Sequence, residues 1–124
     1  MSAQGNGTPL TAGQRGLSFA GWQLPGMRQA VPDMEARAHT SRLAYAAAAK
    51  MLRGEPFKKE AAVAKLVSSN AAMDNSRAAT QVFGGYGFMN EYAVGRFYRD
   101  AKILEIGEGT SEVQRMLIAR QLGL

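Results

Sequence analysis

A single acidic residue between two glycines is the most informative chemical feature of this chain. Glu108 lies between Gly107 and Gly109, and two hydroxyl residues, Thr110 and Ser111, follow. Glycine on both sides lets the backbone approach a ligand closely, and hydroxyl residues are typical of a helix N-cap. A helix N-terminus attracts anions and phosphate groups. The spacing therefore predicts an exposed turn that presents one carboxylate at the start of a final helix.

A second glycine-rich turn lies upstream. Residues 81–88 form the sequence Gln-Val-Phe-Gly-Gly-Tyr-Gly-Phe, which predicts a helix C-terminus followed by a glycine turn. Gln81 supplies an amide donor and acceptor, and Gly84 and Gly85 permit close approach of a ligand. Taken alone, a pair of glycines identifies no ligand.

Both turns, together with the Arg-Asp-Ala-Lys-Ile sequence at 99–103, strongly resemble the C-terminal end of the acyl-CoA dehydrogenases. These flavoenzymes desaturate acyl-CoA thioesters. A glutamate beside glycines is ordinarily a solvated turn residue, but the resemblance implies that Glu108 is the general base for the proton α to the thioester carbonyl. Because that proton is weakly acidic, its base must lie close and be partly desolvated. The resemblance also implies that the Glu108 backbone N–H helps to hold the thioester oxygen.

The resemblance implies FAD as the cofactor and assigns contacts to both turns. Gln81, Gly84 and Gly85 would reach the FAD of a neighbouring subunit, near its adenine and pyrophosphate end. Thr110 and Glu112 would contact FAD as well. For Thr110, helix capping alone is the alternative, and at the position of Glu112 the family varies between acid and amide.

Gly107 and Gly109 are the expected substrate contacts. Many relatives carry a tyrosine at the position of Gly107, where it helps to wall the acyl pocket. Glycine there leaves room for a branched, cyclic or otherwise bulky acyl group, or a neighbouring side chain fills the gap. Some relatives carry the base on an upstream helix and have a small residue at the position of Glu108, whereas here the acid is present.

The composition is typical of one helical domain. The 124 residues are 46% hydrophobic and 20% charged, which is ordinary for a globular protein, and this length suits one domain. Abundant alanine and few aromatic residues favour helices over strands. The chain has no cysteine, which excludes disulfides and thiolate chemistry. One histidine and scattered acids offer no metal-ligand spacing, so we expect no metal site.

The net charge of +5 predicts attraction for anions. No lysine and arginine cluster is interleaved with aromatic residues, so we expect no nucleic-acid partner, and a phosphate-rich cofactor accounts for the charge equally well. No apolar run reaches the ~18 residues of a membrane-spanning helix, and the N-terminus lacks a signal-peptide pattern. We therefore expect no membrane span and a cytoplasmic protein, or a mitochondrial-matrix protein in a eukaryote.

The elements that position the two turns are predicted to be helices. An apolar stripe over 27–52, with spacings of four and three, places Tyr45 in the core and predicts a helix packed along its length. We expect that helix to start near Pro32. The break at 54–56 ends it, and a second helix over 58–83 follows as its antiparallel partner, because the connection is short.

Three further elements are expected beyond the second helix. A short helix lies within 90–97, and a separate short element or turn follows over 99–105. The final helix is capped by Thr110 or Ser111 and runs to about Gln121.

No stretch resembles a strand, so the predicted fold class is all-α, an incomplete antiparallel up-and-down helical bundle. Residues 1–26 are glycine-rich and polar and are expected to be disordered or linker-like. The helical domain is expected over 27–124.

The resemblance extends over about residues 33–124. A complete acyl-CoA dehydrogenase also has an N-terminal helical domain and a middle β-domain that packs on the flavin ring and CoA. A base works through proximity and exclusion of water, so these 124 residues need other walls around Glu108. Two main interpretations stay open. In the first, the chain is part of an acyl-CoA dehydrogenase whose active site is completed by other domains or by a partner chain, in a homo-oligomer or a hetero-oligomer. In the second, the chain is a catalytically inactive helical assembly module. An unrelated anion-binding protein is a third.

Overall fold

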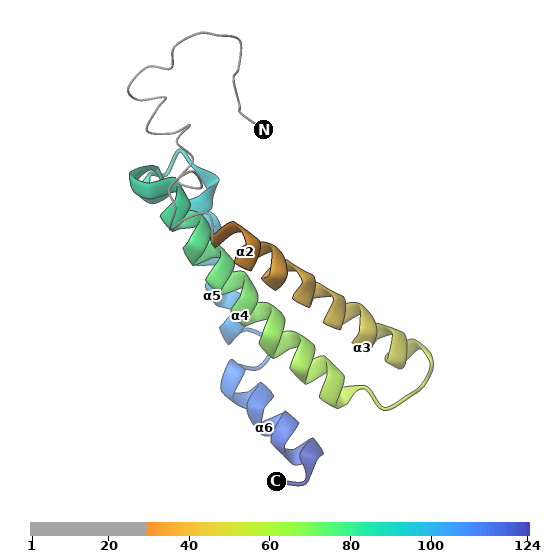
Figure 1. Cartoon of the computed structure of the whole chain (residues 1–124). Coiled ribbons are helices and arrows are strands. Elements are labelled where there is room, and N and C mark those ends of the chain that lie inside the picture. The colour runs from red at the N-terminus through yellow and green to blue at the C-terminus, as the bar shows by residue number, and fades with distance from the viewer. Residues whose placement is uncertain (1–29) are drawn as a thin grey trace.

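Helices account for nearly all of residues 30–124, the part of the chain that the computed structural model describes (Figure 1). The predicted linker-like segment 1–26 and the first residues of the apolar stripe lie outside the described residues. Within them there is no strand, which confirms the all-α class. The elements are α2 (Ala30–Ala38), a 3₁₀ turn η2 (His39–Ser41), α3 (Arg42–Leu52), α4 (Lys58–Phe83), a 3₁₀ turn η3 (Gly84–Phe88), α5 (Ala93–Ile106) and α6 (Ser111–Leu122).

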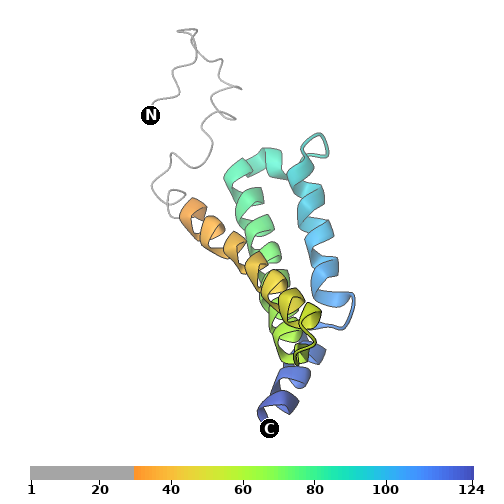
Figure 2. The same cartoon turned by 90° about the vertical axis from the view of Figure 1, so that its right-hand side faces the viewer.

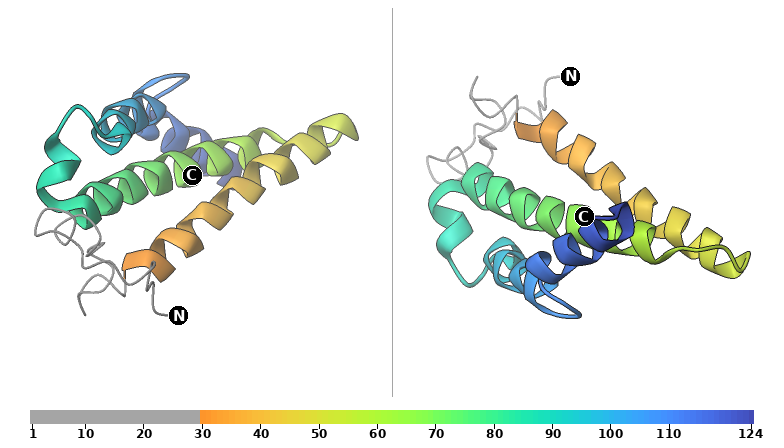
Figure 3. Two further views of the ribbon diagram at one scale, coloured as in Figure 1. Left: turned by 90° about the horizontal axis from the view of Figure 1, so that it is seen from above. Right: turned by 90° about the horizontal axis from the view of Figure 1, so that it is seen from below.

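Helix α4 is the central element, and the other helices pack against it. Helices α2 and α3 form an almost continuous rod that runs antiparallel to α4 on one side, while α5 returns along the other side (Figures 1 and 2). Helix α6 lies beside the N-terminal part of α4, as the view from below in Figure 3 shows. The predicted antiparallel arrangement is therefore confirmed.

Small side chains make up most of the packed interior. Alanine and serine let helix backbones approach closely, so the helices pack with little bulk between them. No large side chain of the described residues is completely buried. The most buried apolar residues are Ala47, Ala62, Ala64, Ala71, Met73, Val94 and Ala101.

Polar contacts fix the rod of α2 and α3 onto α4. The Asn75 amide donates to the Met34 carbonyl at 2.9 Å, and the Ser68 hydroxyl donates to the Thr40 carbonyl at 3.3 Å. A connection of five residues leads from α3 to α4 and turns at Gly54, whose φ of +71° favours glycine.

The apolar stripe predicted over 27–52 does not face α4 in the way expected. Tyr45 is 76% exposed and Leu52 is 83% exposed, so the prediction that Tyr45 lies in the core is wrong. The face of the rod that packs on α4 contains Ala47, which is buried, and Met34 and Thr40, which are partly buried. Because alanine brings the two backbones together, the larger side chains are directed to the opposite side of the rod.

The predicted break between 90–97 and 99–105 is also wrong, because α5 is one helix from Ala93 to Ile106. Val94 and Ala101 are two turns apart on one face and are both buried. Gly95 does not break the helix and instead allows a close approach, since a Cβ there would lie 3.1 Å from the Gly87 carbonyl oxygen.

Candidate active site

The loop between α5 and α6 holds Glu108 in an unusual conformation. Glu108 has φ of +55° and is the only residue other than glycine with positive φ among residues 30–124. Such a left-handed conformation costs a residue with a side chain about 1–2 kcal/mol. The adjacent Gly109 has φ of +89°. The loop therefore exposes the Glu108 side chain through a backbone shape that other contacts must maintain.

Two side chains from different helices hold this loop. The buried Gln114 amide of α6 donates to the Glu108 carbonyl at 3.3 Å and to the Gly109 carbonyl at 3.2 Å. Lys65 of α4 donates through Nζ to the same Gly109 carbonyl at 2.6 Å. The Gly107 N–H donates to the Ile103 carbonyl at 2.7 Å and closes the last turn of α5. Neither Lys65 nor Gln114 was predicted from the sequence as part of the site.

Thr110 caps α6, which confirms the predicted start of the final helix. Its hydroxyl oxygen accepts a hydrogen bond from the Val113 N–H at 3.4 Å. Glu112 lies in the first turn, and hydrogen bonds from its own N–H and from the Thr110 hydroxyl lower the pKa of its carboxyl. Ser111 Oγ is buried and has no hydrogen-bond partner among the described residues. The helix N-terminus thus presents an ionised carboxylate beside the loop.

The two glycines that flank Glu108 each have a close neighbour. A Cβ at Gly107 would lie 3.1 Å from the Ile103 carbonyl oxygen, and a Cβ at Gly109 would lie 2.9 Å from the Gln114 amide nitrogen. Glycine at both positions therefore has a local packing reason within this chain. Whether Gly107 also enlarges an acyl pocket stays a prediction, because such a pocket needs walls from outside residues 30–124.

The second turn borders an open cavity of about 760 Å³ where α4, η3 and the start of α5 meet. Gln81, Gly84 and Gly85 line it and are exposed, and a Cβ at either glycine would meet nothing within 4 Å. Asn90 and Arg99 also line the cavity, and they supply a polar group and a cation. A concave surface with open backbone and a guanidinium suits a phosphate-bearing group such as the pyrophosphate of FAD.

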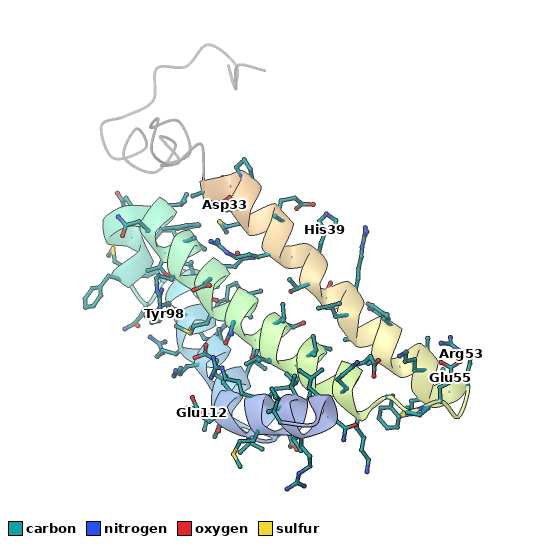
Figure 4. All side chains as sticks on the ribbon, turned by 60° about the horizontal axis from the view of Figure 1, so that its bottom comes forward. Asp33, His39, Arg53, Glu55, Tyr98 and Glu112 are labelled. Carbon is teal, nitrogen blue, oxygen red and sulfur yellow. The ribbon has the colours of Figure 1, made fainter. Side chains whose placement is uncertain are left out.

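The predicted cofactor contacts lie in two separate groups. Gln81, Gly84 and Gly85 lie at the N-terminal end of α5, whereas Thr110 and Glu112 follow its C-terminal end. The helix has 14 residues and so spans about 20 Å. Figure 4 shows Tyr98, which lines the cavity at the second turn, on α5, and Glu112 at the start of α6.

Residues 30–124 show neither a candidate metal site nor a candidate membrane-spanning helix. They contain no group of three or more histidine or acidic side chains arranged to hold a metal ion. None of the helices in this part of the chain has both the length and the apolar character that crossing a bilayer requires.

The chain is similar to known proteins over most of its length. Residues 19–123 match the family described as acyl-CoA dehydrogenase, C-terminal domain. An acyl-CoA dehydrogenase of Bacillus subtilis (strain 168) is 42% identical over 117 residues, which cover 94% of this chain and 28% of that protein. The short-chain specific acyl-CoA dehydrogenase of Megasphaera elsdenii is 50% identical over 86 residues, or 68% of this chain and 22% of that protein.

Solved structures share the helical arrangement. Butyryl-CoA dehydrogenase from Megasphaera elsdenii matches with a TM-score of 0.79 and 42% identity, over 83% of this chain and 27% of that one. An FAD complex of PigA matches with a TM-score of 0.81 and 27% identity, over 90% of this chain and 32% of that one. The chain thus spans between about a fifth and a third of the length of these four proteins. With Glu108 held between two glycines at the start of α6, these matches place the chain in the acyl-CoA dehydrogenase family, as its C-terminal helical domain.

Proposed function

We propose that this chain supplies the general base to an FAD-dependent acyl-CoA dehydrogenase site that other domains or a partner chain complete. The observation that carries the proposal is the Glu108 loop. Its backbone is held in a left-handed conformation by Gln114 and Lys65, and this arrangement presents an exposed carboxylate at a fixed point. A base that must reach one weakly acidic proton needs such placement.

The proposed substrate class is an acyl-CoA thioester that is desaturated between its α and β carbons. Glu108 would remove the α proton, and its backbone N–H would donate to the thioester oxygen, where negative charge develops. Bound FAD would supply the acceptor for the β hydrogen, which leaves as hydride. Other domains or a partner chain would cover the loop and exclude water from the carboxylate.

The acyl group itself stays open within this class. The similar proteins include dehydrogenases named for short-chain substrates and a cyclohexane-1-carbonyl-CoA dehydrogenase of Geobacter metallireducens that is 42% identical over 97 residues. Their names fit either of the two roles predicted for Gly107, a roomier acyl pocket or a gap filled by a neighbouring side chain.

We propose further that one chain contacts two FAD molecules in an oligomer. Thr110 and Glu112 would contact the FAD of the site that Glu108 serves. Gln81, Gly84 and Gly85 would contact the FAD of a neighbouring subunit, near its adenine and pyrophosphate. The length of α5 between the two groups supports this division, as does the open cavity at the second turn.

The second candidate function is a catalytically inactive helical assembly module. The observation that favours it is the number of exposed large apolar side chains among residues 30–124, of which Leu52, Phe88 and Leu124 are each more than four-fifths exposed. Where exposed apolar side chains are contiguous, they mark interfaces with other proteins. Both functions require a partner, and only the first requires flavin.

Flavin retention and bleaching distinguish the two functions. The chain is purified with excess FAD, alone and together with the N-terminal and middle domains of the Megasphaera elsdenii relative, and its absorbance is recorded before and after a panel of acyl-CoA thioesters is added. The proposal predicts retained flavin in the assembly, bleaching by substrate and no bleaching in Glu108→Gln. Glu105→Gln is the matched control, because Glu105 is a nearby glutamate of α5 paired with Lys102. Assembly without retained flavin would establish the second function instead.

A further inference from the structure

The Gly109 carbonyl receives hydrogen bonds from two helices that are far apart in sequence. Lys65 Nζ donates to it from α4 at 2.6 Å, across 44 residues of chain. Gln114 Nε2 donates to it from α6 at 3.2 Å. A short ammonium contact of this kind is stronger than a bond between neutral groups. The loop is therefore fixed to the central helix of the bundle and not only to the helix that follows it.

Lys65 differs from the other lysines whose contacts are defined. Lys50 and Lys102 each pair with a carboxylate, Glu60 and Glu105 respectively. Lys65 is partly buried and has no carboxylate within salt-bridge distance among residues 30–124, and its ammonium is directed to a backbone carbonyl instead. Withdrawing an ammonium from water without a charged partner is unfavourable, so this contact needs the rest of the loop to be in place.

The neighbouring residue in the loop is the one whose backbone needs support. Glu108 adopts a left-handed conformation that a residue with a side chain disfavours. Gln114 holds the Glu108 carbonyl, while Lys65 and Gln114 together hold the next carbonyl, that of Gly109. With two consecutive carbonyls fixed, the backbone sets the direction of the Glu108 Cα–Cβ bond, and the side chain is exposed.

We propose that Lys65 is a positioning residue for the Glu108 carboxylate, which acts on the thioester through the placement that Lys65 imposes on the loop. The proposal rests on the proposed function of Glu108, but the ordering of the loop by Lys65 is measurable without flavin or substrate. A displacement of about 1 Å in a reacting group can reduce a rate about 100-fold, so a loosened loop has a large effect on chemistry even when the bundle stays folded.

The first experiment measures backbone order in the full chain by ¹⁵N relaxation. In the wild-type chain, the order parameters of the Glu108 and Gly109 amides are expected near about 0.85, and in Lys65→Met they are expected to fall below about 0.6. Lys65→Arg, which keeps a charged donor, is expected to retain most of the order. Lys59→Met is the matched control, because Lys59 is an exposed lysine of the same helix. Equal order parameters in wild type and Lys65→Met would overturn the proposal.

A measurement on the wild-type chain decides the matter if Lys65→Met does not fold. The ammonium protons of Lys65 are expected to exchange with water at least about tenfold more slowly than those of Lys59, because one of them is held by a carbonyl. Exchange at the same rate for both lysines would show that the contact does not persist in solution, and the proposal would fail.

The second experiment uses the flavin-loaded assembly described above. Lys65→Met is expected to slow substrate bleaching at saturating acyl-CoA by about 10-fold to 100-fold with no loss of retained flavin, and Lys65→Arg is expected to restore most of the rate. Bleaching at the wild-type rate in a Lys65→Met assembly would contradict the role of Lys65. Normal bleaching in Glu108→Gln would contradict the proposed function instead, and the order parameters of the loop would be unaffected by that result.

Discussion

Replacing Gly109 with alanine tests how the Glu108 loop is held, and Gly54→Ala is its matched control. Both glycines have positive φ, +89° at Gly109 and +71° at Gly54. A Cβ at Gly54 would meet nothing within 4 Å, whereas a Cβ at Gly109 would lie 2.9 Å from the Gln114 amide nitrogen. The two variants therefore share the backbone penalty and differ in the contact with Gln114.

The expected difference follows from that contact. Alanine in a left-handed conformation costs about 1–2 kcal/mol, and the stiffer unfolded chain offsets about 0.4–1 kcal/mol of this, in both variants alike. In Gly109→Ala the Gln114 amide must also move away, and it loses its bonds to the Glu108 and Gly109 carbonyls. Each bond is worth about 0.5–1.5 kcal/mol. Gly109→Ala should therefore lose about 1–3 kcal/mol more unfolding free energy than Gly54→Ala.

Urea unfolding followed by helical circular dichroism measures this difference. With a denaturant slope of about 1–3 kcal/mol per molar, an excess of 2 kcal/mol lowers the midpoint by about 1 M. When the same two substitutions are made in a Gln114→Leu background, Gly109→Ala should lose no more unfolding free energy than Gly54→Ala. Leucine has no amide N–H to donate to the loop carbonyls, so the new Cβ breaks no hydrogen bond there. Equal losses in Gly109→Ala and Gly54→Ala, or an excess that persists in Gln114→Leu, would refute the reasoning.

Three further predictions concern α4 and the second turn. Gly87→Ala should lower the unfolding free energy by about 1–3 kcal/mol, because its Cβ would clash with the Thr80 carbonyl oxygen of α4; an unchanged urea midpoint would show that this close approach is not present in solution. Gly85→Ala should change the unfolding free energy by less than about 0.5 kcal/mol, since its Cβ would meet nothing within 4 Å. It should nevertheless weaken flavin retention in the assembly. Unchanged retention would contradict the proposal that the cavity contacts the cofactor. The pKa of Glu60 is held below its ordinary value of 4.5 mainly by the hydrogen bond from Lys50. The stability that the ionised Glu60 carboxylate contributes is therefore present above pH 4.5 and is lost as the pH falls through the lowered pKa. Glu60→Gln should therefore be less stable than wild type at about pH 7. The difference should shrink as the pH falls below 4.5 through the lowered pKa, and a difference that does not shrink in acid would contradict this.

Elements bounded by strong local signals were predicted well from the sequence. Helix α4 has the bounds Lys58–Phe83 that were expected, because Pro56 precedes it and Gly84 follows it. Thr110 caps α6 as expected, since an N-cap depends on a hydroxyl residue and the few residues after it. Such features are decided within a short stretch of chain.

Two features that depend on the details of packing between helices were predicted wrongly. Periodicity identified an apolar stripe over 27–52 but not the side of the rod that faces α4, because the alanines around Ala47 pack closer than Tyr45 allows. The continuity of α5 depends on burial of Val94 and Ala101 against α4. Local propensity is a weak guide where tertiary contacts of this kind decide the outcome.

The residues of the candidate site also differ in whether the sequence alone could identify them. Glu108 and its glycines are identified by their order along the chain and by family resemblance. Lys65 lies 44 residues from the loop carbonyl that it contacts, and an alanine-rich helix with several lysines gives no sign of which one turns inward. Gln114 carried a weak signal, since a polar residue on a helix that packs against α4 is a candidate for a buried contact.

The central claim, that Glu108 removes the α proton, is tested most directly by single-turnover flavin bleaching in the assembly with an acyl-CoA that carries deuterium at its α carbon. The account predicts slower bleaching with the deuterated thioester than with the ordinary one in the wild-type assembly. It also predicts a rate about 10²–10⁴-fold lower in Glu108→Gln, with retained flavin unchanged. A Glu108→Gln assembly that bleaches at the wild-type rate with both thioesters would show that another group removes the proton.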